Sequence, residues 1–167
     1  MQRFCLGLLT FWILADQLLK TYTVKRVPFY PETIDVIPGF LSLGHSFNKG
    51  AAWSLFWGQL GWLTALRFIV GIILIFYFLN APITRWQRLA LSLIASGAIA
   101  NAIDGTFRSG VVDMLILQPL TAVYQSIFGN PFPIFNIADV GVVSGSILLM
   151  LSLVFAPRAV SQVSSEF

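Results

Sequence analysis

The stretch FNIADVGVVSGSILLMLSLVFA, from Phe135 to Ala156, sets a carboxylate at the head of a long apolar run. A helix that crosses a bilayer needs about 20 mostly apolar residues, and residues 140–156 approach that length. A carboxylate beside hydrocarbon is costly, so an ionisable residue there usually has a functional reason. The stretch therefore predicts a membrane-spanning helix with Asp139 at a functional boundary.

The composition of the whole chain also indicates a membrane protein. The chain has 167 residues, of which 57% are hydrophobic and 10% are charged, and its mean hydropathy is +0.82. A soluble domain usually carries about 25% charged residues. The net charge of +3 is small and the basic residues are scattered, so we expect no nucleic-acid partner. The length predicts one domain over residues 1–167.

Four apolar stretches predict an all-α membrane protein with four transmembrane helices. The first stretch resembles a signal peptide, but Asp16 and Lys20 stand where a cleavage site needs small residues, so we expect a retained helix. Alternation and Pro-Gly punctuation predict two short strands in the first long loop, at residues 34–37 and 40–43. The predicted helices cover residues 4–20, 60–79, 86–103 and 140–156, and the long loops cover residues 21–59 and 105–138.

Four crossings place both long loops on the same side of the membrane. The positive-inside rule favours an external position for these loops, because the short connection at residues 80–85 and the amino terminus are flanked by arginine. The arginines predicted to be cytoplasmic are Arg3, Arg85, Arg88 and Arg158.

Four of the seven acidic residues fall at the same predicted membrane boundary: Asp16, Asp104, Asp113 and Asp139. Asp16 and Lys20 are spaced i,i+4 on one helical face, which favours a structural pair. The alternative for Asp104 and Asp139 is that they mark helix ends, where Asp139 would gain from the helix macrodipole. Asp113 lies between apolar residues and needs either a partner or a task.

Two asparagines stand three residues before two of these acids. Asn101 precedes Asp104, and Asn136 precedes Asp139, so each amide shares a helical face with a carboxylate and can orient it. Two close carboxylates do not both ionise cheaply, so one keeps a proton while the other acts as a base. This arrangement suits the activation of water against an amide.

Metal chemistry is not expected. A zinc site usually uses His or Cys ligands, and the chain has one of each, His45 and Cys5. We predict that His45 is a loop residue, and that no metal or cofactor takes part. Arg67, inside the second helix, is expected to reach the outer interface or to pair with an acid.

Five short motifs, in order along the chain, resemble those of lipoprotein signal peptidase, also called signal peptidase II. DQLLK at residues 16–20 is similar to that family's Asp-Gln-x-x-Lys, and FNKGAAWS at residues 47–54 is close to its Asn-x-Gly-Ala-Ala-Phe. NAID at residues 101–104, GVVDM at residues 110–114 and FNIAD at residues 135–139 follow. The resemblance covers essentially the whole chain.

The resemblance implies a bacterial aspartyl protease of the cytoplasmic (inner) membrane, multi-pass, with its active site at the extracytoplasmic face. It implies cleavage of prolipoproteins on the amino side of a lipid-modified cysteine, membrane lipid around the site, a monomer, and a small β-cradle in the first extracytoplasmic loop. Asp113 and Asp139 would be the catalytic pair. The residues that would shape the site or bind there are Asn48, Gly50, Asn101, Asp104, Arg108, Asn136 and Ala138.

The chain departs from the family pattern at four places: Trp53, Ala100, Gly105 and Met114. Gly105 stands where the family usually has arginine directly after the aspartate of its third motif. This change puts the role of Asp104 in doubt, and Arg108 is the candidate replacement.

Two other classes of function fit some of these features. A small transporter or ion-binding protein could use the same aspartates as a relay, but acids at one boundary make no path across the membrane, and no inverted repeat supports this class. A non-enzymatic scaffold would not need clustered acids.

Overall fold

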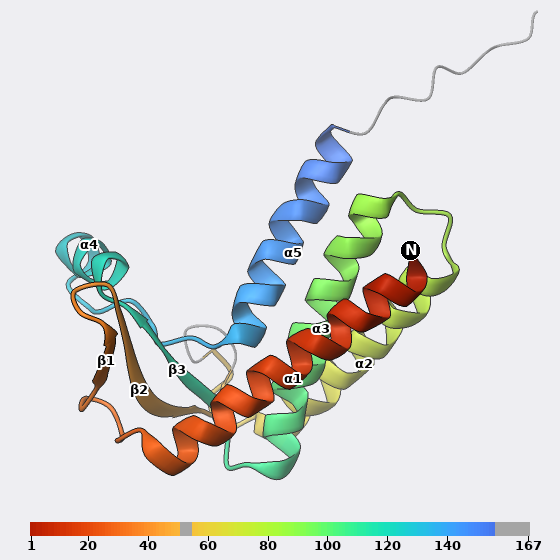
Figure 1. Ribbon diagram of the computed structural model, residues 1–167. Helices are drawn as coiled ribbons and strands as arrows, with labels where there is room; N and C mark the ends of the chain where they lie inside the picture. The colour runs from red at the N-terminus through yellow and green to blue at the C-terminus, as the bar shows by residue number, and fades with distance from the viewer. Residues whose placement is uncertain (51–54, 156–167) are drawn as a thin grey trace, which may run out of the picture.

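The computed structural model describes residues 1–50 and 55–155, as eight elements in chain order (Figure 1). Four helices are long and apolar enough to cross a membrane: α1 (Gln2–Arg26), α2 (Leu60–Asn80), α3 (Arg85–Phe107) and α5 (Ile137–Val154). The other elements are the strands β1 (Ile34–Ile37), β2 (Leu41–Asn48) and β3 (Val111–Leu117) and the short helix α4 (Gln118–Phe128).

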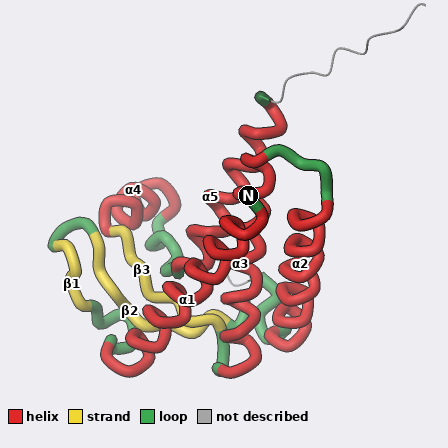
Figure 2. Tube along the Cα trace, turned by 45° about the vertical axis from the view of Figure 1, so that its right-hand side comes forward, coloured by secondary structure: helices red, strands yellow, loops and turns green. Residues whose placement is uncertain are grey.

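Helix α3 is the centre of the helical bundle, and α1, α2 and α5 pack around it (Figure 2). It begins with a capping box, in which Thr84 and Gln87 satisfy each other's backbone N–H groups. Small side chains cover its buried faces, so neighbouring backbones approach closely, as is common between membrane helices. These buried small residues are Ala90, Ser92, Ala95, Ser96, Gly97, Ala100 and Ala102.

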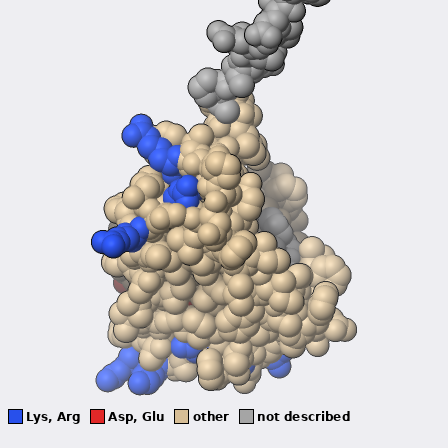
Figure 3. All heavy atoms as spheres, turned by 90° about the vertical axis from the view of Figure 1, so that its right-hand side faces the viewer, with Lys and Arg blue, Asp and Glu red and all other residues tan. Residues whose placement is uncertain are grey.

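The outer faces of the other helices are apolar and exposed. Phe11 and Leu18 on α1, Phe76 on α2, and Val143 and Met150 on α5 each expose more than half of their surface. On the face shown in Figure 3, Lys and Arg gather at two ends of the molecule, and a broad band of other residues separates them. Apolar outer faces, together with an uncharged band between two charged ends, are the pattern expected for helices that span a bilayer.

The three strands form one antiparallel sheet in the order β1-β2-β3, at one end of the bundle (Figure 1). Strands β1 and β2 come from the first predicted loop, and the small sheet there is confirmed. The third strand comes from the second loop, where no strand was predicted, and it pairs with β2 from Leu41↔Leu117 to Asn48↔Val111. The sheet therefore joins the two long loops into one structure.

Several predicted boundaries are wrong. Helix α1 continues past residue 20 to Arg26, and α3 continues past residue 103 to Phe107, so the loops predicted at residues 21–59 and 105–138 are shorter. In both cases the apolar run ends at polar residues that are buried inside the protein. A prediction from hydropathy alone ends the helix at such residues, although the helix continues. Helix α5 begins at Ile137 rather than at residue 140, because Asn136 caps it.

His45 is a strand residue and not the predicted loop residue. It lies buried in β2, and its ring stacks on Phe29 with 4.2 Å between the ring centroids. The predictions for Trp53, Ala156 and Arg158 lie outside the described residues.

The packing of α3 against α5 generates a prediction. A Cβ atom on Gly97 would fall on the Ala138 carbonyl oxygen, whereas a Cβ atom on Gly7 of α1 would meet no heavy atom within 4 Å. We expect Gly97→Ala to destabilise the protein by about 1–3 kcal/mol through overpacking, measured as a lower unfolding temperature in detergent. Gly7→Ala is the control and should not lower that temperature. Equal stability of the two variants would contradict this close packing.

Candidate active site

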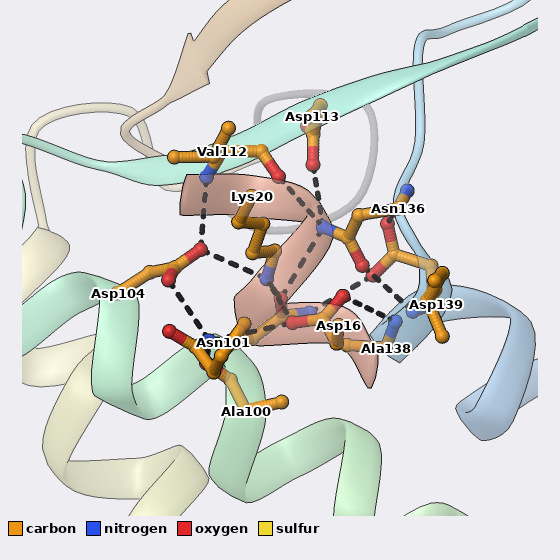
Figure 4. A network of polar contacts seen from close by, with 12 residues as sticks. Asp16, Lys20, Ala100, Asn101, Asp104, Val112, Asp113, Asn136, Ala138 and Asp139 are labelled. Atoms are coloured by element: carbon orange, nitrogen blue, oxygen red, sulfur yellow. Dashed lines mark hydrogen bonds and ion pairs between the residues drawn. The ribbon is translucent and has the colours of Figure 1, made fainter. Parts of the chain in front are cut away.

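Three separate segments bring the central predicted site residues together where the bundle meets the sheet (Figure 4). Asp113 lies on β3, Asp139 in the first turn of α5, and Asn101 in the last third of α3. They line a cavity of about 490 Å³ that also contains Asn48 and Arg67. Its remaining lining is mostly apolar: Val111, Leu120, Phe132, Pro133, Ile134, Phe135, Val140, Val142, Val143, Ser144 and Ile147.

The start of α5 fixes Asp139. Asn136 is the N-cap, and its Oδ1 accepts a hydrogen bond from the Asp139 N–H at 2.9 Å. In return, Asp139 Oδ2 accepts the Asn136 N–H at 3.2 Å, which completes a capping box. The other oxygen of Asp139 accepts a hydrogen bond from Asn101 Nδ2 at 2.9 Å. Asp139 therefore does mark a helix end, and one of its oxygens still faces the asparagine of a second helix.

Asn136 also holds the other aspartate. Its Nδ2 donates to Asp113 Oδ1 at 2.6 Å, so one asparagine contacts both carboxylates. Phe135 brings Asn136 to β3, because its backbone exchanges hydrogen bonds with Leu115 at 2.8 and 3.2 Å. A second amide, that of Asn48, also hydrogen-bonds Asp113.

The surroundings of Asp113 favour its protonated form. Burial, together with the nearby charge of Asp139, raises the pKa of Asp113 to about 7, although the hydrogen bonds from Asn136 and Asn48 and the charge of Lys20 act in the opposite direction. A carboxyl group of this kind keeps a proton close to neutral pH. The charge of Asp139 therefore affects the protonation of Asp113.

Lys20 is a fully buried cation beside this pair. Its Nζ lies 2.8 Å from Asp16 Oδ2, 2.8 Å from Asp104 Oδ2 and 2.8 Å from Asn101 Oδ1. An ammonium group has three donors, so all of them are used. The contact with Asn101 Oδ1 also sets the orientation of that amide, because it leaves Nδ2 to face Asp139.

The two carboxylates bound to Lys20 each hold the backbone directly before one of the paired aspartates. Asp16 Oδ1 accepts the Ala138 N–H at 2.9 Å, and Asp104 Oδ2 accepts the Val112 N–H at 3.0 Å. Ala138 and Val112 precede Asp139 and Asp113 in the chain. Lys20 therefore links α1, α3, β3 and α5 around the site, which is a larger role than that of the predicted i,i+4 pair.

Asp104 has a cationic partner in spite of Gly105. Arg108, one helical turn later, forms an ion pair with Asp104 Oδ1. A Cβ atom on Gly105 would fall on Thr64 Oγ1 of α2, so this position faces a neighbouring helix and has no room for an arginine. Arg108 thus pairs with Asp104, and its role as a replacement for the family's arginine stays a prediction.

Gln17 and Arg67 take part in the hydrogen-bond network of the site, although the sequence analysis did not predict either as a site residue. Gln17 donates from Nε2 to Asp104 Oδ1 at 3.1 Å and accepts from Arg108 Nη1 at 2.8 Å; its position inside the DQLLK motif was the available signal. Arg67 donates from Nη2 to the carbonyl oxygen of Gly50 at 2.9 Å, and Gly50 N–H donates to Asn48 Oδ1 at 2.9 Å.

The Lys20 contacts predict a large loss of stability when the cation is removed. Lys20→Met leaves Asp16 and Asp104 buried without their shared partner, and breaking a buried ion pair in this way costs about 3–5 kcal/mol. Unfolding in detergent should show this loss, whereas Lys25→Met, at an exposed position of the same helix, should show almost none. Adding Asp16→Asn and Asp104→Asn to Lys20→Met should restore part of the stability. If Lys20→Met were as stable as Lys25→Met, the cation would not hold the site together.

Comparison with known proteins agrees with this geometry. Residues 8–155 match the family described as Signal peptidase (SPase) II. The chain is 43% identical over 146 residues to the lipoprotein signal peptidase of Deinococcus radiodurans, covering 87% of this chain and 76% of that protein. It is 38% identical over 148 residues to the lipoprotein signal peptidase of Enterococcus faecalis, covering 88% of this chain and 85% of that protein.

A solved structure has the same fold. It is described as a bacterial membrane enzyme determined by the in meso method at 2.3 Å resolution, and it superposes with a TM-score of 0.77 at 28% identity, covering 98% of this chain and 93% of that one. With the family match over most of its length, the chain belongs to the signal peptidase II family.

Proposed function

We propose that the protein is an aspartic endopeptidase that removes signal peptides from prolipoproteins, cutting on the amino side of a diacylglyceryl-modified cysteine. Membership of the signal peptidase II family makes it a protease, and four apolar helices make it a multi-pass membrane protein. The observation that carries the aspartic mechanism is the bridge made by Asn136, which contacts both Asp113 and Asp139 at the wall of one cavity.

The two carboxyl groups suit different halves of the reaction. Asp113 supplies the protonated group, because burial and the neighbouring carboxylate raise its pKa to about 7. Asp139 supplies the ionised group, because Asn101 Nδ2, the Asn136 N–H and the amino end of α5 all favour a negative charge there.

The proposed steps balance in protons and bonds. Asp139 takes a proton from a water molecule, the water oxygen bonds to the scissile carbonyl carbon, and Asp113 gives its proton to the carbonyl oxygen. The resulting diol collapses when Asp139 returns its proton to the amide nitrogen and the C–N bond breaks. Asp113 then recovers a proton from the diol hydroxyl as the new carboxylic acid forms, so one proton again serves the pair.

The cavity suits a lipidated substrate. Beyond the two aspartates, its lining continues along α5 through Val140, Val143 and Ile147, and Leu120 of α4 and Phe132 add to the apolar surface. Burying acyl chains contributes about 0.8 kcal/mol per CH₂ group. The diacylglyceryl group and membrane lipid are therefore the proposed occupants of this lining.

The dyad proposal predicts the effect of single substitutions. Asp113→Asn or Asp139→Asn should reduce cleavage of a diacylglyceryl-modified peptide on the order of 10²–10⁴-fold or more, because each removes a positioned acid or base. The double variant should be little worse than either single one, since the two groups act as a unit. Glu32→Gln, at an exposed carboxylate in the first loop, is the control and should keep full activity. Full activity of folded Asp113→Asn would instead favour an ion-binding role, and inhibition by a chelator would point the same way.

The same dyad predicts a bell-shaped dependence of activity on pH. Activity needs one proton on the pair, and the two macroscopic pKa values belong to the pair as a whole. Because the pKa of Asp113 is raised to about 7, the proton is lost as the pH rises through that region, so activity should fall on the alkaline side of about pH 7. A rate that keeps rising well above pH 8 would contradict the shared proton.

The proposed location is the bacterial cytoplasmic membrane, with the sheet and the active site on the extracytoplasmic face and the protein acting as a monomer. In a Cys5→Ser background, a cysteine at Ser126 on exposed α4 should react with an impermeant maleimide on intact spheroplasts. A cysteine at Pro82, exposed between α2 and α3, should react only after permeabilisation. The opposite labelling pattern would reverse the orientation.

A further inference from the structure

The charges around the site differ in how they are paired. Lys20 is bound by Asp16 and Asp104, each at 2.8 Å, and Arg108 is also paired with Asp104. These two cations therefore belong to two carboxylates that are not part of the catalytic pair.

Arg67 is the one cation among the described residues that line the cavity. It lies on α2, lines the same cavity as Asp113 and Asp139, and is in the electrostatic field of both. Within residues 1–50 and 55–155, no carboxylate oxygen lies within 4.0 Å of its guanidinium group, and its one hydrogen bond there goes to the neutral carbonyl of Gly50. Its charge is thus not neutralised by a direct ion pair in the described part of the chain.

The balance of charge around the site depends on this residue. Four carboxylates and three cations leave one excess negative charge when every group is ionised, and one proton on the catalytic pair removes it. A partly buried site is most stable when its charges compensate. The described groups compensate when the pair carries one proton, which is the state that the proposed reaction requires.

We propose that Arg67 is a positioning residue that acts as the counter-charge of the catalytic pair and holds it in the singly protonated form. This inference rests on the proposed function. The separation matters for the reaction, because a cation that formed a direct ion pair with Asp139 would compete with water for the oxygen that must accept a proton. From a greater distance the same charge favours ionisation of one carboxyl group without adding a further contact to the oxygens of Asp139, which already accept hydrogen bonds from Asn101 and Asn136.

Arg67 also has a second connection to the pair, through hydrogen bonds. It holds the Gly50 carbonyl, Gly50 donates to Asn48, and Asn48 hydrogen-bonds Asp113. The test must therefore separate the charge of Arg67 from its donor groups.

The test compares three variants across a range of pH. Arg67→Lys keeps the charge, Arg67→Gln keeps a donor without the charge, and Arg67→Met keeps neither. Loss of a nearby cation makes both ionisations of the pair harder, so we expect both limbs of the pH profile of kcat/KM to move to higher pH by about one unit in Arg67→Gln and Arg67→Met. Arg67→Lys should keep the wild-type profile, and KM should change less than kcat at acidic pH.

The other charges facing the pair stay constant in these variants: Asp16 and Lys20 from α1, Asp104 and Arg108 from α3, Asp113 from β3 and Asp139 from α5. Arg85→Met, at an exposed position near the start of α3, is the control for loss of an arginine and should leave the profile unchanged.

A spectroscopic measurement keeps the proposal testable if a variant loses activity. The infrared band of the protonated carboxyl group, identified by its loss in Asp113→Asn, should persist to higher pH in Arg67→Gln than in the wild type or in Arg67→Lys. Unshifted profiles and bands in both neutral variants would overturn the inference, and so would a shift in Arg67→Lys equal to that in Arg67→Gln. Activity retained in folded Asp113→Asn and Asp139→Asn would instead overturn the proposed function, so failure of the proposed function can be distinguished from failure of the inference about Arg67.

Discussion

The arrangement of the site depends on one buried ammonium group. Lys20 gives its three donors to Asp16, Asp104 and Asn101, and through them it reaches the backbone before Asp139, the backbone before Asp113 and the side chain of Asp139 itself. Isolated charges buried in this way would be expensive, and only this mutual compensation makes the cluster stable. The bundle and the sheet are therefore joined by polar contacts as well as by the apolar packing of Leu19 on the sheet.

The sequence predicted those features that depend on interactions between residues close together in the chain. Apolar runs located four helices, the i,i+4 spacing identified Asp16 with Lys20, and the i,i+3 spacing identified the asparagines beside the acids. The capping box of Asn136 and Asp139 is a local interaction of the same kind, and it explains why a carboxylate can stand at the head of an apolar helix. The resemblance of five motifs to the signal peptidase II family then identified the predicted site residues that the structure brings together.

The features that the sequence did not predict are contacts between distant segments. Strand β3 forms by pairing with the edge of β2, and no sequence pattern within the second loop indicates that β2 is its partner. The tight contact of Gly105 with Thr64 joins two helices, and without it the missing arginine had no explanation. The boundary errors at the ends of α1 and α3 have a related cause, because hydropathy treats Lys20 and Asp104 as solvated groups when both are buried in the protein.

The spacing of Asp16 and Lys20 has a consequence for biosynthesis. The first helix leaves the ribosome long before Asp104, Asn101 or Ala138 has been made, so at that time its two charges have only each other. As an i,i+4 ion pair they present a nearly neutral surface, which lowers the cost of entering the bilayer early. The contacts of Lys20 with Asp104 and Asn101 can form once α3 has been made, whereas the contact of Asp16 with Ala138 forms only when α5 arrives, and Asp139 arrives with it. A partly synthesised chain can therefore be inserted in the membrane before Asp139, one member of the proposed catalytic pair, has been made.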